Sequence, residues 1–246
     1  MPIEHAPLHR RWPEVATSQV ATGPWRATVT DFDMVYQEVT TGHVTGGSLC
    51  FLYHMNLGPV LTASMIEYYY KEPHNMQGHR ETQRLNMPLT PRLETRIGKT
   101  TYSSVTDLKA SIEIQESGEK VTITATGKLM DALQNNVPSG PVAYTARYTF
   151  EPAGVGIEIE VDSLPEGGVE MILPVISRSG EAVSQPNKQT VQIRRPGGVL
   201  TTTASAEPSF NPNERVFNLV PGFEALALTW PMTAGVPLKI NISAET

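Results

Sequence analysis

Two segments in the middle of the chain decide the fold: residues 110–131, ASIEIQESGEKVTITATGKLMD, and residues 142–164, VAYTARYTFEPAGVGIEIEVDSL. In both segments apolar residues alternate with polar ones, which is the period of a half-buried β-strand. Each alternation is interrupted once by a turn signal, Ser117-Gly118 in the first segment and Pro152-Ala153-Gly154 in the second. Each segment therefore predicts a β-hairpin.

The same pattern extends over most of the chain. Residues 190–206, TVQIRRPGGVLTTTASA, predict a third hairpin that turns at Pro196-Gly197-Gly198. Counting the other alternating runs gives about fourteen short strands, and only residues 128–136, KLMDALQNN, suggest a short helix. We predict an all-β protein with little or no helix, a large antiparallel β-sandwich of two sheets (supersandwich-like). No fixed repeat period indicates a propeller.

The first part of the chain has a different character. Residues 1–24 are rich in proline and show no hydrophobic period. We interpret residues 1–24 as an arm or linker and residues 25–246 as a single β-sandwich domain, because sandwiches of this size often form one domain.

Charge and composition exclude several classes of partner. The net charge is −6, and basic residues occur only in pairs such as Arg10-Arg11, so we expect no nucleic-acid partner. No apolar run approaches the roughly 20 residues of a membrane span, and the N-terminus lacks the apolar region of a signal peptide, so we expect no membrane partner. Cys50 is the single cysteine, and its apolar strand predicts a buried, unreactive thiol.

Most groups able to carry out acid–base chemistry lie in residues 42–80, GHVTGGSLCFLYHMNLGPVLTASMIEYYYKEPHNMQGHR. Residues 48–54 and 60–70 predict two strands, and residues 72–91 predict a long polar loop. Polar groups at the ends of sheet elements can be held firmly enough for chemistry. The segment contains four histidines and four tyrosines together with Asn75 and Arg80: His43, His54, His74, His79, Tyr53, Tyr68, Tyr69 and Tyr70.

Metal binding and sugar stacking are further uses for residues of these types. The four histidines could gather around zinc if the strands pair, and His43 is the predicted metal ligand, although no His-x-His spacing occurs. Asp31 and Asp33 could bind calcium or act as acid and base, but two carboxylates on a strand are usually a solvated face. The tryptophans could stack on sugars, with Trp230 expected in the core: Trp12, Trp25 and Trp230.

Three stretches carry a resemblance to a known family: GHVTGGSLCFLYH, GPVLTASMIEYY and YTARYTFEPAGVGIEIEVDS. Over about residues 40–165 they resemble the β-sandwich module of heparinase II/III-like polysaccharide lyases. Those lyases carry catalytic residues largely on an N-terminal α/α toroid, which nothing in this chain could form. Their zinc-binding His-x-His followed by Asp is here Gly42-His43-Val44-Thr45. The resemblance implies an upstream α/α toroid or a homo-oligomer as partner, and a periplasmic or secreted location.

The resemblance also implies β-elimination on an acidic, uronate-containing polysaccharide. That reaction needs a group that neutralises the uronate carboxylate, a base for the proton on the adjacent carbon, and an acid for the leaving oxygen. Asn75 and Arg80 are the expected carboxylate clamp, and Arg suits it because its fork binds a carboxylate through two hydrogen bonds. The remaining assignments are His74 or His79 as base, Tyr68 or Tyr70 as acid, and Tyr53 and His54 in substrate binding.

Two other functions are compatible with the same residues. The first is a non-catalytic carbohydrate-binding or scaffold domain of a larger lyase, since aromatic residues in strands usually serve packing. The second is a metal-dependent carbohydrate-active hydrolase or oxidative enzyme on the same sandwich.

Overall fold

The computed structural model describes residues 8–32, 44–64, 68–71, 76–79, 89–218 and 221–246. These residues form antiparallel sheets and two short 3-10 turns, η2 (Pro13–Val15) and η3 (Ser104–Thr106). They contain twenty strands, more than the fourteen or so expected, and they confirm the predicted all-β sandwich. The prediction of two sheets was wrong, because the strands divide among three larger sheets. No helix in the described ranges has the length and apolar character of a membrane span.

The strands belong to three larger sheets and one separate hairpin, β6 (Tyr68–Lys71) with β7 (Met76–His79). Sheet I contains, in spatial order, β1 (His9–Trp12), β2 (Thr17–Thr22), β3 (Trp25–Thr30), β4 (Ser48–His54) and β5 (Gly58–Thr62). Sheet II contains β10 (Ser111–Ser117), β11 (Lys120–Lys128), β12 (Ala143–Glu151), β13 (Gly154–Val161), β20 (Leu238–Glu245), β17 (Gly198–Ala204), β16 (Thr190–Arg195) and β15 (Ala182–Asn187). Sheet III contains β18 (Val216–Asn218), β19 (Phe223–Pro231), β14 (Glu170–Ile176), β8 (Arg92–Ile97) and β9 (Thr100–Ser103).

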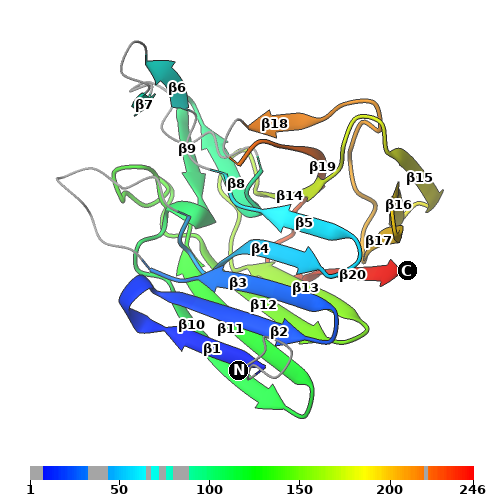
Figure 1. Ribbon diagram of the computed structural model, residues 1–246. Coiled ribbons are helices and arrows are strands. Elements are labelled where there is room, and N and C mark those ends of the chain that lie inside the picture. The colour runs from blue at the N-terminus through cyan, green and yellow to red at the C-terminus, as the bar shows by residue number, and fades with distance from the viewer. Residues whose placement is uncertain (1–7, 33–43, 65–67, 72–75, 80–88, 219–220) are drawn as a thin grey trace.

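One apolar core lies between these sheets. In Figure 1, β1–β4 lie in front of β10–β13, and β5 of sheet I lies beside β14 of sheet III. Four strands of sheet II contribute a row of directly paired, buried residues: Ile123, Tyr148, Ile157 and Ile240. Burying one such large apolar side chain stabilises a fold by roughly 1.5–3 kcal/mol, so the alternation seen in the sequence is the main source of stability.

The three hairpins predicted from turn signals are confirmed. Strands β10 and β11 pair around Ser117, β12 and β13 pair around the turn before Gly154, and β16 and β17 pair around the turn before Gly198. Residues 128–136 contain no helix. There the carboxylate of Asp131 accepts hydrogen bonds from the backbone N–H of Leu133 and Asn135 and closes a turn.

Residues 9–22 differ from the arm that was expected, because they form β1 and β2 at the edge of sheet I. The side chain of Arg11 on β1 explains this position. Its guanidinium donates two hydrogen bonds to the buried carboxylate of Asp31, which follows β3, at 2.9 and 2.8 Å. A bidentate ion pair of this kind is geometrically specific and fixes the first strand on the sheet.

The connection into β4 passes very close to sheet II at Gly46 and Gly47. The Gly46 carbonyl accepts a hydrogen bond of 2.7 Å from the hydroxyl of Tyr144 on β12. Gly47 has a φ of +63°, and a Cβ added there would overlap the side chain of Ala125 on β11. Only glycine permits both this backbone conformation and this approach of the two layers.

Gly47→Ala is expected to destabilise the protein more than Gly98→Ala. Both positions have nearly the same φ, +63° and +61°, but nothing lies within 4 Å of a Cβ at Gly98. The two variants share the cost of the left-handed backbone, so their difference isolates the overlap with sheet II, about 1–3 kcal/mol. Urea unfolding measures both free energies. Equal losses in the two variants would contradict this close approach.

Candidate functional site

The residues predicted to carry out catalysis fall largely on the hairpin of β6 and β7. Its backbone register places Tyr68 opposite His79 and Tyr70 opposite Gln77. The structure therefore brings one predicted acid and one predicted base to partner positions on neighbouring strands. It also shortens the expected polar loop, because residues 76–79 form a strand. His43, His74, Asn75 and Arg80 lie outside the described residues.

His54 is held in the interior by the turn that follows it. Its Nδ1 accepts hydrogen bonds from the backbone N–H of Asn56 and Leu57, both at 3.3 Å. The edge of its ring packs against Trp25, with the ring centroids 4.6 Å apart. Burial lowers the pKa of His54, because the apolar surroundings disfavour the charged imidazolium. His54 is 3% exposed, so it has a structural role in the β4–β5 turn and leaves little surface for a substrate.

The structure also shows how far the three tryptophans and the single cysteine are buried. Trp230 lies in the core as expected, and Trp25 is buried as well, so it offers no face to a sugar. Trp12 remains partly exposed, with the guanidinium of Arg10 3.8 Å above its ring. Cys50 is half-buried, less than the sequence predicted, and desolvation raises the pKa of its thiol to about 11, which disfavours the reactive thiolate.

Tyr53 lies in an open cleft of about 670 Å³, within the size range of ligand sites. The cleft is formed where all three sheets meet. Its walls come from the β4–β5 turn, the segment after β14, the end of β16 and the β18–β19 hairpin: Tyr53, residues 55–59, Ile176, Arg178, Glu181, Arg195, Pro196, Phe217 and residues 222–224.

The floor of this cleft contains a buried cation, Arg195. Its guanidinium donates hydrogen bonds to the carbonyl oxygens of Pro59, at 2.8 Å, and of Ile176. Its Nε lies 3.7 Å from the carboxylate of Glu181 and has no hydrogen-bond partner among the described residues. Burial lowers the pKa of Arg195, and the negative charge of Glu181 opposes that change. One side chain of sheet II thus contacts backbone of sheets I and III.

The rim of the cleft combines exposed apolar groups with charge. Phe217 and Met55 are more than half exposed, and Tyr53 stacks on Phe51 with 6.1 Å between ring centroids. The guanidinium of Arg178 donates no hydrogen bond to the described residues, and Glu224 is held by the backbone N–H and hydroxyl of Ser179. These hydrogen bonds lower the pKa of Glu224. Aromatic faces beside a cation suit an acidic sugar, which has apolar C–H faces and a carboxylate.

The sequence did not indicate this cleft beyond Tyr53. Arg178, Arg195 and Phe217 are far apart in the chain and share no motif. The structure also separates the residues that were predicted to form one site. Tyr53 and His54 lie at the β4–β5 turn, whereas the β6–β7 hairpin projects beyond the opposite end of β5 (Figure 1). Within the described ranges no group of three metal-ligating side chains is placed to hold an ion.

Comparison with known proteins gives this architecture a family. Residues 9–245 match the family described as ulvan lyase C-terminal domain. The chain belongs to the ulvan lyase C-terminal domain family. A broad-specificity ulvan lyase of Formosa agariphila is 31% identical over 209 residues, which is 84% of this chain and 32% of that protein. The chain therefore spans about a third of the length of the curated relative that it matches.

Solved structures show the same sandwich as this ulvan lyase C-terminal domain. Heparinase III superposes with a TM-score of 0.62 at 12% identity, over 94% of this chain and 35% of that one. The heparan sulfate lyase HepC of Pedobacter heparinus gives 0.58 at 11% identity, over 97% of this chain and 37% of that one. The Slr1438 protein of Synechocystis gives 0.55 at 8% identity, with 98% of each chain covered. The resemblance to the sandwich of heparinase-like lyases is thus confirmed, and it extends well beyond residues 40–165.

Arg195→Ala is expected to lower the free energy of unfolding by about 3 kcal/mol or more, because it leaves buried carbonyl groups and Glu181 without their partner. Arg194→Ala is the matched control, since Arg194 is the neighbouring residue on β16 and is exposed. Its change is expected to stay within about 0.5 kcal/mol. Urea unfolding of both variants measures the difference, and an Arg195→Ala protein as stable as the control would rule out this role.

Proposed function

We propose that this chain is the β-sandwich part of a polysaccharide lyase that cleaves an acidic, uronate-containing polysaccharide by β-elimination. The family match over residues 9–245 carries the proposal. The name of the Formosa agariphila relative suggests ulvan as the first substrate to test. Because the chain spans about a third of that relative, we also propose that an α/α toroid or a second copy completes the enzyme.

The chemistry that we propose divides one elimination among a few side chains. Asn75 and Arg80 neutralise the uronate carboxylate, which makes the proton on the adjacent carbon more acidic. His79 or His74 removes that proton. The electron pair forms the new carbon–carbon double bond and the glycosidic carbon–oxygen bond breaks. Tyr68 or Tyr70 then protonates the leaving oxygen.

The backbone pairing of Tyr68 with His79 supports this assignment, because a base and an acid must reach neighbouring atoms of one substrate. We propose that Tyr53, in the cleft, binds further sugars of the chain. His54 would take part in substrate binding only through the β4–β5 turn that it holds, since it is buried. His43 remains the proposed metal ligand, for zinc.

A second candidate function is a non-catalytic carbohydrate-binding or scaffold module of a larger lyase. The open cleft with its exposed Phe217 and its Arg178 favours it, because neither residue needs to take part in a reaction to hold a sugar.

A metal-dependent hydrolase or oxidative enzyme is the third proposal. Metal analysis of the purified protein separates it from the others, since it requires one tightly held transition metal per chain.

Turnover on uronate polysaccharides, with ulvan among them, tests the lyase proposal through the ultraviolet absorbance of the unsaturated product. We expect substitution of the base or of the acid, by His79→Ala or Tyr68→Phe, to reduce kcat by about 10²–10⁴-fold. His74→Ala and Tyr70→Phe decide between the alternatives for each role. His9→Ala and Tyr69→Phe are controls, and we expect them to retain turnover.

Assays with added zinc or calcium and with a chelator test the metal proposal in the same series. No product from any polymer, with and without either ion, would leave the chain without catalysis of its own. Binding to the same polymers would then favour the carbohydrate-binding module.

A further inference from the structure

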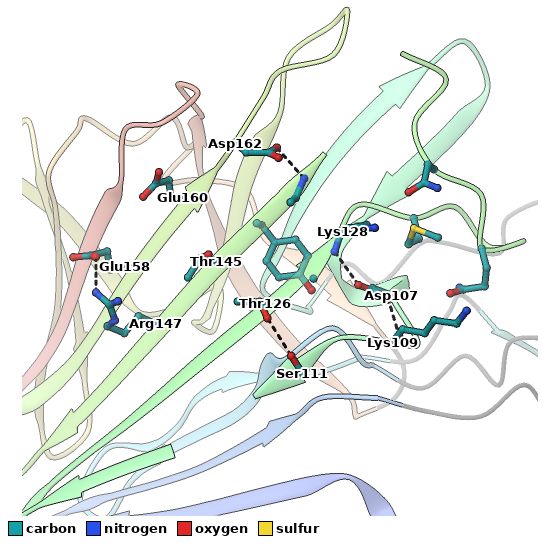
Figure 2. Close-up of a pocket in the computed structure, with 16 residues that line it drawn as sticks. Asp107, Lys109, Ser111, Thr126, Lys128, Thr145, Arg147, Glu158, Glu160 and Asp162 are labelled. Carbon is teal, nitrogen blue, oxygen red and sulfur yellow. Dashed lines mark hydrogen bonds and ion pairs between the residues drawn. The ribbon is translucent and has the colours of Figure 1, made fainter. Parts of the chain in front are cut away.

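A second hollow, of about 910 Å³, lies over β10–β13 of sheet II (Figure 2). Its lining residues and those of the cleft at Arg195 are entirely different. Its volume also falls in the range of ligand sites, about 300–1,000 Å³. The connection between β11 and β12 and the residues before β10 form its side wall.

The floor of this hollow is a row of hydroxyl groups on the outer face of the sheet. Ala125 is buried in the core, so the neighbouring Thr126 points outward, where it is exposed. The register places Ser111 and Thr145 on either side of Thr126, and Glu160 next to Thr145. The hydroxyls of Ser111 and Thr126 are hydrogen-bonded at 3.1 Å. This surface can both donate and accept hydrogen bonds.

One end of the hollow is cationic because it contains two lysines. The buried carboxylate of Asp107 holds the backbone of both lysines in place. The two oxygens of Asp107 accept hydrogen bonds from the backbone N–H of Lys109, at 2.9 Å, and of Lys128, at 2.8 Å. A Cβ on Gly127 would lie 2.7 Å from that carboxylate, so the glycine leaves room for it. Neither lysine ammonium forms an ion pair with a carboxylate in the described part of the chain. Figure 2 shows both lysines beside Asp107.

The opposite end is acidic, as Figure 2 shows. The carboxylate of Glu158 is already paired with Arg147, at 3.1 Å, and with Lys239, at 3.4 Å. Asp162 accepts a hydrogen bond from the backbone N–H of Ala143. Glu160 makes no hydrogen bond or ion pair within the described residues and is left as an acceptor.

We propose that this hollow is a separate binding site for an oligosaccharide in which anionic and neutral sugars alternate. The ammonium groups of Lys109 and Lys128 hold the sulfate or carboxylate of one sugar. Thr126 and Thr145 bind its hydroxyls, and Glu160 accepts a hydrogen bond from a hydroxyl of the neutral neighbour. The site holds a glycan away from the cleft and from the β6–β7 hairpin, and it needs no elimination reaction.

The hollow has a cationic end and an acidic end, and this separation of charge determines the class of ligand that it can bind. A polymer with an anion on every unit places a second negative charge against Glu160 and Asp162, and like charges repel strongly at short range. A neutral sugar leaves the lysines unused. A chain that is anionic at one unit and neutral at the next satisfies both ends, with charge-assisted hydrogen bonds at the lysines.

Titration calorimetry of the 246-residue protein with four hexasaccharides tests this site. We expect binding of hyaluronan, which carries a carboxylate on alternate sugars, or of a keratan sulfate hexasaccharide that is sulfated only on its N-acetylglucosamine units. The stronger of the two identifies the anion. Maltohexaose, which is neutral, and the hexamer of polygalacturonate, which is acidic at every sugar, should bind much more weakly. Failure of both alternating probes, or equal binding of polygalacturonate, would overturn the proposal.

Paired variants locate the binding. Lys109→Ala with Lys128→Ala should weaken the Kd of the better probe by about tenfold or more, as expected for the loss of two charged contacts. Lys120→Ala with Lys188→Ala removes the same charge at the other end of β11 and at an exposed loop, and should leave the Kd unchanged. Equal weakening by the two pairs would mean that net charge alone attracts the probe, and would overturn the site.

A second pair tests the hydroxyl floor without changing charge. Thr145→Val removes one hydroxyl from the hollow. Thr149→Val removes one hydroxyl from the same face of β12 but outside the hollow. Only Thr145→Val should weaken binding. A protein that shows no turnover but binds through Lys109 and Lys128 would contradict the catalytic proposal and support this one, so the two can fail separately.

Discussion

The meeting of the three sheets depends on the guanidinium of Arg195, which joins them at one point. Arg195 ends β16 of sheet II, and it donates to Pro59 on β5 of sheet I and to Ile176 at the end of β14 in sheet III. A planar group with five donors can satisfy carbonyls that point from different directions. An apolar residue of similar size would leave those carbonyls without partners, and a buried unpaired polar group destabilises a protein by about 1–3 kcal/mol.

The same contact shapes the cleft. Because Arg195 fixes the β4–β5 turn against the end of β14, Tyr53, Arg178 and the β18–β19 hairpin line one open cleft. His54 also stabilises the β4–β5 turn, since its Nδ1 accepts hydrogen bonds from the backbone N–H groups of Asn56 and Leu57. The interactions that stabilise the meeting of the sheets are thus the ones that form the cleft.

Local patterns in the sequence predicted the parts of the fold that depend on neighbouring residues. The turns at Ser117-Gly118, Pro152-Ala153-Gly154 and Pro196-Gly197-Gly198 lie in the predicted hairpins, because their chemistry and the flanking alternation are both local. Residues 9–22 were missed as strands. Their place on the sheet depends on the pairing of Arg11 with Asp31, twenty residues away, which no short window contains.

The candidate site was harder to predict for the same reason. Tyr68 and His79 were proposed from chemical type alone, and the structure shows only that their backbones pair in a short hairpin. The burial of His54 and the assembly of Tyr53 with Arg178 and Phe217 depend on contacts between distant segments. Asp107 is a similar case, since it joins the backbone of Lys109 to that of Lys128, on either side of the β10–β11 hairpin.

Hydrogen–deuterium exchange of the wild-type protein and of Arg195→Lys tests most directly whether one side chain holds the three sheets together. Lysine keeps the charge but loses the planar fork. We predict faster exchange at the same time in the β4–β5 turn, at the end of β14 and at the end of β16. Faster exchange confined to β16, with the other two segments unchanged, would contradict the account.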